Sequence, residues 1–139
     1  MPDFFFPTKG ISFRLGQPRK IKQWLVKIAS AEGRRIESLT FVFVSDPYLA
    51  KLNQQYLNHN TLTDILTFDY SDGGPVVGEI YISIPRVREN ARNYGQLFNT
   101  ELRRVMAHGL LHILGYKDKT PRQSAAMRRK EEACLSLWF

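Results

Sequence analysis

Residues 100–118 read TELRRVMAHGLLHILGYKD and predict a helix followed by a turn. Apolar side chains recur in this stretch at the spacing of a buried helical stripe; they are Leu102, Val105, Met106, Leu110 and Ile113. His108 and His112 stand four residues apart, so both imidazoles lie on one face of the helix, one turn apart. Two histidines at this spacing on a helix are typical of a metal site.

The residues that follow the second histidine offer a third metal ligand. Gly115 can end the helix in a left-handed conformation, which lets Asp118 turn back toward the two imidazoles. Three protein ligands leave one position of a tetrahedral zinc ion for water, which is the arrangement of catalytic rather than structural sites. The sequence therefore predicts a metal site at His108, His112 and Asp118. The alternative is that the two histidines are ordinary hydrogen-bonded side chains of a helix.

Gly109 bears on the class of metal enzyme. Zinc peptidases of the H-E-x-x-H type carry their general base directly after the first histidine, and this chain has Gly109 there. Peptide hydrolysis by that mechanism is therefore disfavoured.

The composition suits one compact domain over residues 1–139, because 43% of the residues are hydrophobic and can form a core. Cys134 is the only cysteine, so the chain can form neither an internal disulfide nor a cysteine-based zinc site. The apolar run at residues 4–6 is short, is closed by Pro7 and lacks the flanks of a signal peptide, and no segment has the length of a membrane span. We expect a cytoplasmic protein.

The formal net charge is +7, from twenty Lys and Arg residues against thirteen Asp and Glu residues. An excess of this size favours a polyanionic partner, of which nucleic acid is the obvious one. Several basic residues stand near the metal motif, and the candidates for RNA contact are Arg86, Arg88, Arg92, Arg104, Lys117 and Lys119. The alternative is a basic surface that is only solvated.

Alternation and helical periodicity predict four strands and five helices. The strands are expected at 11–15, 39–44, 64–70 and 77–84, and the last two should form a hairpin. The helices are expected at 18–31, 45–57, 85–94, from 100 onward and 120–137, with Ser45 and Thr120 as N-caps. The order βαβαββααα predicts an α+β fold, a small mixed four-stranded sheet packed with about five helices.

Two glutamates are candidates for the general base, since none stands beside His108. Glu79 lies on the polar face of its strand, where it alternates with isoleucines, and Glu101 lies two turns before His108 on the same helix. Glu101 and Arg104 can also be hydrogen-bond partners of a metal-bound imidazole, or ordinary charges that face solvent.

Two other residues of suitable chemistry are expected to stay outside the site. Asp64 is expected to accept hydrogen bonds from backbone groups at the start of its strand. His59 stands in a polar stretch and is expected on the surface.

Four separated blocks of the sequence resemble the YbeY family of metal-dependent rRNA maturation endoribonucleases. They are LNQQY at 52–56, TDILTF at 63–68, GEIYIS at 78–83, and HGLLHILGY at 108–116 with Glu101 ahead of it. The match covers roughly residues 38–119. The resemblance implies a bacterial cytosolic protein with a zinc site on the helix of His108, acting on single-stranded RNA in the maturation of small-subunit rRNA ends and in ribosome quality control.

The chain departs from the family's pattern at two positions. Asp118 stands where the family usually has a third histidine, and Leu57 stands where it usually has an arginine. A carboxylate ligand lowers the net charge of a loaded site to about +1 instead of about +2, which makes the metal a weaker Lewis acid. A harder oxygen ligand also widens the choice of metal, so Ni²⁺, Mn²⁺ and Fe²⁺ stand beside Zn²⁺.

Three functions are compatible with these features. The leading one is a zinc-dependent endoribonuclease specific for single strands, which implies rRNA and the ribosome or its small subunit as partners. The second is a ribosome assembly factor that binds RNA without cutting it, in which the metal only fixes the C-terminal helices. The third is a metallohydrolase of a small substrate, for which RNA affinity should depend little on salt.

Overall fold

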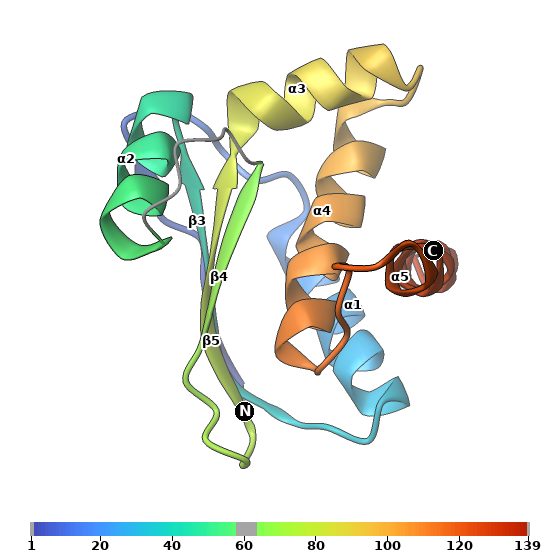
Figure 1. The fold of residues 1–139 in the computed structure, drawn as a ribbon. Coiled ribbons are helices and arrows are strands. Elements are labelled where there is room, and N and C mark those ends of the chain that lie inside the picture. Colours follow the sequence, from blue (N-terminus) through green and yellow to red (C-terminus); the bar gives the residue numbers. More distant parts are fainter. Residues whose placement is uncertain (1, 58–63, 139) are drawn as a thin grey trace.

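The computed structural model describes residues 2–57 and 64–138 and has a mixed sheet with helices on both faces (Figure 1). The elements of the described residues, in chain order, are β1 (Asp3–Phe5), β2 (Thr8–Lys9), α1 (Pro18–Ala31), β3 (Ile36–Val44), α2 (Asp46–Leu57), β4 (Ile65–Asp69), β5 (Val76–Ser83), α3 (Ile84–Asn93), α4 (Phe98–Ile113) and α5 (Pro121–Ser136).

The sheet has the strand order β1-β3-β5-β4, and β2 pairs with β3 beyond the end of β1. The neighbours of β3 run parallel to it, whereas β4 and β5 pair antiparallel. The predicted hairpin and the predicted α+β class with a mixed sheet are therefore confirmed.

The first predicted strand is wrong. Residues 11–15 form no strand, and the sheet gains β1 and β2 instead, so it has five strands rather than four. Pro7 separates the two short pieces, and its carbonyl still accepts a hydrogen bond from the amide of Phe43 at 2.9 Å, which is how an edge strand tolerates proline. Side chains of Ile11, Phe13 and Leu15 pack on the core from an irregular segment. Their alternation thus reflects burial without strand pairing.

Two cores lie on opposite faces of the sheet. The larger one lies between the sheet and the helices α1 and α4, and the smaller lies between the sheet and α2 (Figure 1). α5 packs against α4 and lies beyond it, away from the sheet (Figure 1). The apolar stripe predicted for residues 100–118 is buried in the larger core. α4 is therefore held by the sheet on one side and by α5 on the other.

The predicted helix starts depend on local capping groups. The Ser45 hydroxyl accepts a hydrogen bond from the amide of Tyr48, and Thr120 forms a capping box with Gln123, as expected from the sequence. α4 begins at Phe98 rather than at Thr100. Its N-cap residue is Leu97, whose side chain makes no capping hydrogen bond.

Gly109 lies at a close approach of α4 to the sheet. A Cβ atom at this position would stand 2.8 Å from Cγ2 of Ile80 on β5 and 2.9 Å from Cδ1 of Ile65 on β4. Position 109 therefore faces the sheet. The side chains of His108 and His112 point away from the core and are partly exposed. A glutamate here could not reach the imidazoles, which agrees with the sequence-based argument against an H-E-x-x-H peptidase.

We expect Gly109→Ala to lower the free energy of unfolding by up to about 2 kcal/mol. Overpacking typically costs about 1–3 kcal/mol, and alanine returns about 1 kcal/mol through its higher helix propensity. Urea denaturation measures the change, with Gly16→Ala as the control, because a Cβ atom at Gly16 meets nothing within 4 Å. An equal or greater stability for Gly109→Ala would show that α4 has room to move away from the sheet.

Candidate metal centre

The side chains of His108, His112 and Asp118 come together at the C-terminal end of α4. Their facing atoms form a triangle: the two Nε2 atoms are 3.0 Å apart, and Oδ2 of Asp118 lies 3.3 Å from Nε2 of His108 and 3.4 Å from Nε2 of His112. Bonds of about 2.0–2.2 Å to zinc place the ligand atoms of a tetrahedron about 3.3–3.6 Å apart. The donor set and its spacing therefore fit a divalent metal ion.

The turn that returns Asp118 to the helix follows directly from Gly115. Its φ of +111° is in the region that favours glycine, and its amide donates to the carbonyl of His112 at 3.1 Å. The amide of Tyr116 donates to the carbonyl of Leu111 at 3.0 Å, which completes a Schellman motif. The predicted left-handed end of this helix is therefore confirmed.

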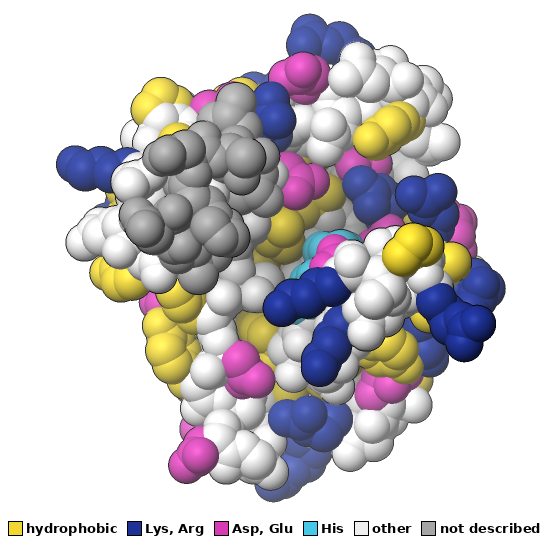
Figure 2. Space-filling view, viewed as in Figure 1, with side chains coloured by type: hydrophobic (Ala, Val, Ile, Leu, Met, Phe, Trp, Pro, Cys, Tyr) yellow, Lys and Arg dark blue, Asp and Glu magenta, His cyan; other side chains and the backbone are white. Residues whose placement is uncertain are grey.

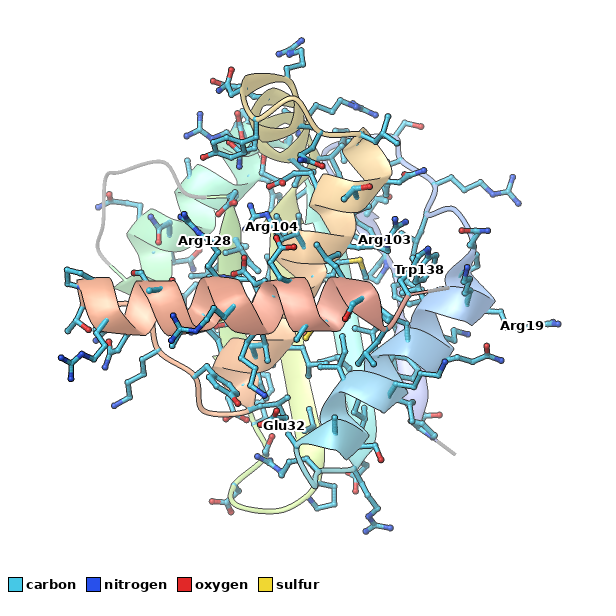
Figure 3. All side chains as sticks on the ribbon, turned by 90° about the vertical axis from the view of Figure 1, so that its right-hand side faces the viewer. Arg19, Glu32, Arg103, Arg104, Arg128 and Trp138 are labelled. Atoms are coloured by element: carbon cyan, nitrogen blue, oxygen red, sulfur yellow. The ribbon has the colours of Figure 1, made fainter. Side chains whose placement is uncertain are left out.

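The loop that carries Asp118 is anchored at both ends. The hydroxyl of Tyr116 donates to Oε1 of Glu32 at 2.8 Å, and Nζ of Lys130 donates to Oε2 of Glu32 at 2.8 Å. The hydrogen bond from Lys130 lowers the pKa of Glu32 more than burial raises it. At the other end, Ser124 on α5 donates to the backbone carbonyl of Asp118 at 2.9 Å. Glu32 at the end of α1 (Figure 3) and the first turn of α5 thus both position the loop of Asp118, the third candidate ligand.

A buried carboxylate from α5 holds the first histidine. Oε2 of Glu131 lies 2.5 Å from Nδ1 of His108, on the side of the ring away from the ligand triangle. Glu131 is 4% exposed and shares the buried face of α5 with Met127 and Cys134. The residues predicted for the site do not include Glu131. Its signal in the sequence is a single carboxylate within an apolar helical stripe, where burial requires a partner.

Arg104 connects Glu131 to a second buried carboxylate. It donates from Nη1 to Oε1 of Glu131 at 2.8 Å and from Nε to Oε1 of Glu101 at 3.0 Å, and its Nη2 pairs with the other oxygen of Glu101. Glu101 is only 1% exposed. The two charges expected as partners of an imidazole are therefore two contacts (Arg104) and three contacts (Glu101) away from His108.

The surrounding charges act on His108. Burial lowers the pKa of this imidazole, but the hydrogen bond with Glu131 and the negative charges of Glu131, Asp118 and Asp64 outweigh burial and raise it. The Asp64 carboxylate accepts a hydrogen bond from Nδ2 of Asn90 at 3.3 Å. Among the described residues, the acceptor role expected of Asp64 is thus filled by a side-chain donor.

The structure does not bring the two candidate bases to the triangle. Gly78 and Ile80 on β5 face α4, so Glu79 between them points to the opposite face of the sheet, where its carboxylate accepts from the hydroxyl of Tyr70 at 3.1 Å. Both oxygens of Glu101 contact Arg104. His59 lies outside the described residues.

The predicted RNA-contact residues fall into separate groups. Lys117 and Lys119 flank Asp118 and line a cleft of about 320 Å³ beside His112. Figure 2 shows Lys and Arg side chains around the opening in which the histidines are visible. Arg86, Arg88 and Arg92 lie apart from these lysines, on α3, and Arg104 is engaged by carboxylates.

None of the described helices is both long enough and apolar enough to cross a membrane.

The chain is similar to known proteins over nearly its whole length. The family model described as Endoribonuclease YbeY matches residues 10–138. The Endoribonuclease YbeY of Cytophaga hutchinsonii is 46% identical over 134 residues, which cover 96% of this chain and 94% of that protein. The Endoribonuclease YbeY of Flavobacterium psychrophilum is 44% identical over 128 residues, which cover 92% and 91%. The solution structure of TM1509 from Thermotoga maritima matches with a TM-score of 0.65 and 28% identity, covering 95% of this chain and 87% of that one. The chain belongs to the YbeY endoribonuclease family.

Proposed function

We propose that this chain is a zinc-dependent endoribonuclease that cuts single-stranded RNA during small-subunit rRNA 3′ end maturation and ribosome quality control in the bacterial cytoplasm. Membership of the YbeY family makes the chain an endoribonuclease, a hydrolase that acts on RNA. The observation that supports the metal dependence is the triangle of His108, His112 and Asp118: its two edges to Asp118, 3.3 and 3.4 Å, have the length of a zinc tetrahedron's edges, and its third edge, 3.0 Å, is shorter. We further propose that residues 1–139 act as a single domain.

The residues at the triangle have distinct roles in this proposal. Zinc bound there supplies an activated water and stabilises negative charge on the phosphoryl oxygens. His108 and His112 present Nε2 to the ion, and Asp118 adds a carboxylate oxygen. Lys117 and Lys119 extend the positive field across the cleft and hold phosphates of the RNA strand.

The proton acceptor is proposed to be Asp64 rather than the glutamates predicted from the sequence. Its negative charge acts on His108, and it is held by Asn90 at the start of β4 without being part of the triangle. Neither Glu79 nor Glu101 has a carboxylate that faces the triangle.

The test is cleavage of a labelled single-stranded rRNA 3′ fragment and of its duplex form. Zinc-loaded protein should cut only the single strand, chelated protein should cut neither, and Asp64→Asn should keep its zinc while losing cleavage. His108→Ala should lose cleavage and keep most of its RNA affinity. Binding of RNA without cutting by any loaded form would support the assembly factor, and binding without salt dependence would support a small-substrate hydrolase.

The two lysines beside Asp118 give a prediction for RNA affinity. We expect Lys117→Gln/Lys119→Gln to weaken binding of single-stranded RNA and to reduce the slope of log affinity against log salt by about 1–2, because about one counterion is released per phosphate contact. Fluorescence anisotropy at several salt concentrations measures both. Lys22→Gln on α1 is the control, since Lys22 is exposed and lies on another helix. An unchanged slope would remove these lysines from the RNA path.

A further inference from the structure

Glu131 uses both of its carboxylate oxygens on groups of α4. Oε2 accepts from Nδ1 of His108, and Oε1 accepts from Nη1 of Arg104. Because a carboxylate can only accept, the neutral His108 ring must carry its proton on Nδ1. The lone pair of the ring is then on Nε2, which is the atom in the ligand triangle. Glu131 thus determines which nitrogen can bind a metal.

The geometry of Glu131 is itself restrained. Arg104 contacts Glu131 with one end of its guanidinium group and Glu101 with the rest. The hydrogen bonds that Arg104 donates to Glu101 contribute most to raising its pKa above the ordinary value; the hydrogen bond to Glu131 adds to this shift, and burial opposes it. Glu101 and Arg104 are on α4, whereas Glu131 is on α5, so the ionic contacts join the two helices.

The two histidines differ in this respect. Within the described part of the chain, the Nδ1 atom of His112 has no carboxylate contact comparable to that of His108. The restraint therefore acts on one ligand only, and it reaches that ligand from a helix that supplies none of the three ligand side chains.

We infer that Glu131 is a positioning residue of the metal site: it selects the Nδ1–H tautomer of His108 and makes metal affinity depend on the docking of α5 through Arg104. This inference rests on the metal site proposed above. It adds to the role of α5, which also anchors the backbone of Asp118 through Ser124.

The experiment compares Glu131→Ala with Glu132→Ala, which removes the same charge from the exposed neighbouring position of α5. Zn²⁺ titration against a fluorescent chelator should show an affinity lower by about 10–100-fold for Glu131→Ala, as is typical when a hydrogen-bond partner of a ligand is removed. Glu132→Ala should bind like wild type. Hydrogen exchange should show that Zn²⁺ protects α5 in wild type and protects it less in Glu131→Ala.

A second readout needs no metal. Long-range ¹H–¹⁵N spectra of the metal-free protein, at a pH high enough to keep the imidazoles neutral, report the tautomer of each histidine. His108 should be protonated on Nδ1 in wild type and in Glu132→Ala, and should gain the Nε2–H form in Glu131→Ala. If Glu131→Ala does not fold, Glu131→Gln replaces it. The single oxygen of the glutamine amide cannot accept in full from both His108 and Arg104.

The outcomes separate the inference from the proposed function. A folded Glu131 variant that keeps the Nδ1–H tautomer and the affinity of Glu132→Ala would overturn the inference even if the wild type cuts RNA. A wild type that binds no zinc and cuts no RNA would overturn the proposed function, and with it the role in metal affinity, while the tautomer comparison would still decide whether Glu131 orients the ring.

Discussion

Asp118→Ala is expected to lower the affinity for Zn²⁺ by more than about 100-fold and to abolish RNA cleavage. Removing a mere hydrogen-bond partner of a ligand costs about 10–100-fold in affinity, so losing one of three ligands should cost more. Oδ2 of Asp118 lies 3.3 and 3.4 Å from the Nε2 atoms of His108 and His112. Among the described residues, it is the third atom of the triangle. Competition with a zinc chelator and a cleavage assay on single-stranded RNA measure the two effects.

Two further variants make this prediction specific. Asp3→Ala removes an exposed carboxylate of β1 and should change neither quantity. Asp118→His should keep the metal, because imidazole is a good zinc ligand, and it raises the charge of the loaded site from about +1 to about +2. Half-maximal cleavage should then occur at lower pH than in wild type. If Asp118→Ala retained wild-type affinity and activity, the metal would have to be held without the carboxylate.

Signals within one helical turn predict the local geometry of the site. The spacing of the two histidines, the left-handed Gly115 and the capping box at Thr120 all depend on neighbours in the sequence, and the structure has each of them as expected. The short strands β1 and β2 were beyond such reasoning. They form by parallel pairing with β3, about 35 residues away, and residues 11–15 show the same alternation without any partner strand.

Long-range contacts also explain what the sequence leaves open at the site. The alternation of β5 predicts that Glu79 faces away from the isoleucines, but it does not say which face α4 covers. Glu131 is separated from His108 by 23 residues, and its role appears only when α5 packs on α4. The candidate ligands come from a local motif, whereas the carboxylate that contacts His108 comes from helix packing.

The second large effect is expected from Arg104→Met, which should lower the free energy of unfolding of the metal-free protein by about 3–5 kcal/mol. The substitution keeps much of the side-chain volume and leaves the carboxylates of Glu101 and Glu131 buried without their shared cation. For a chain of this size, the melting temperature should fall on the order of 10–20 °C. Thermal and urea denaturation measure the change.

The chain contains a matched control for burial. Arg86 and Glu89 on α3 form an ion pair at 3.5 Å with the same three-residue spacing as Glu101 and Arg104. The side chains of the two arginines are equally exposed, at 29% and 28%, but the side chain of Glu89 is 50% exposed and that of Glu101 only 1%. Arg86→Met should therefore cost no more than about 1 kcal/mol. The double variant Glu101→Met/Arg104→Met should recover the part of the loss that comes from Glu101, because removing a buried charge together with its partner is often neutral, whereas Glu131 stays buried with only His108 as its partner. Equal effects of Arg86→Met and Arg104→Met would contradict the burial argument.

The effect of Arg104→Met should depend on pH. Burial raises the pKa of Glu131, but the hydrogen bonds from His108 and Arg104 lower it by more, so the pKa lies below the ordinary value of 4.5. A carboxylate with a lowered pKa in the folded state adds stability above its unfolded pKa and loses that stability as the pH falls through its folded pKa. Without Arg104 the pKa of Glu131 rises and this contribution shrinks. The difference between wild type and variant should therefore be largest above about pH 5 and should decrease below pH 4.5, whereas a constant difference would assign the loss to packing alone.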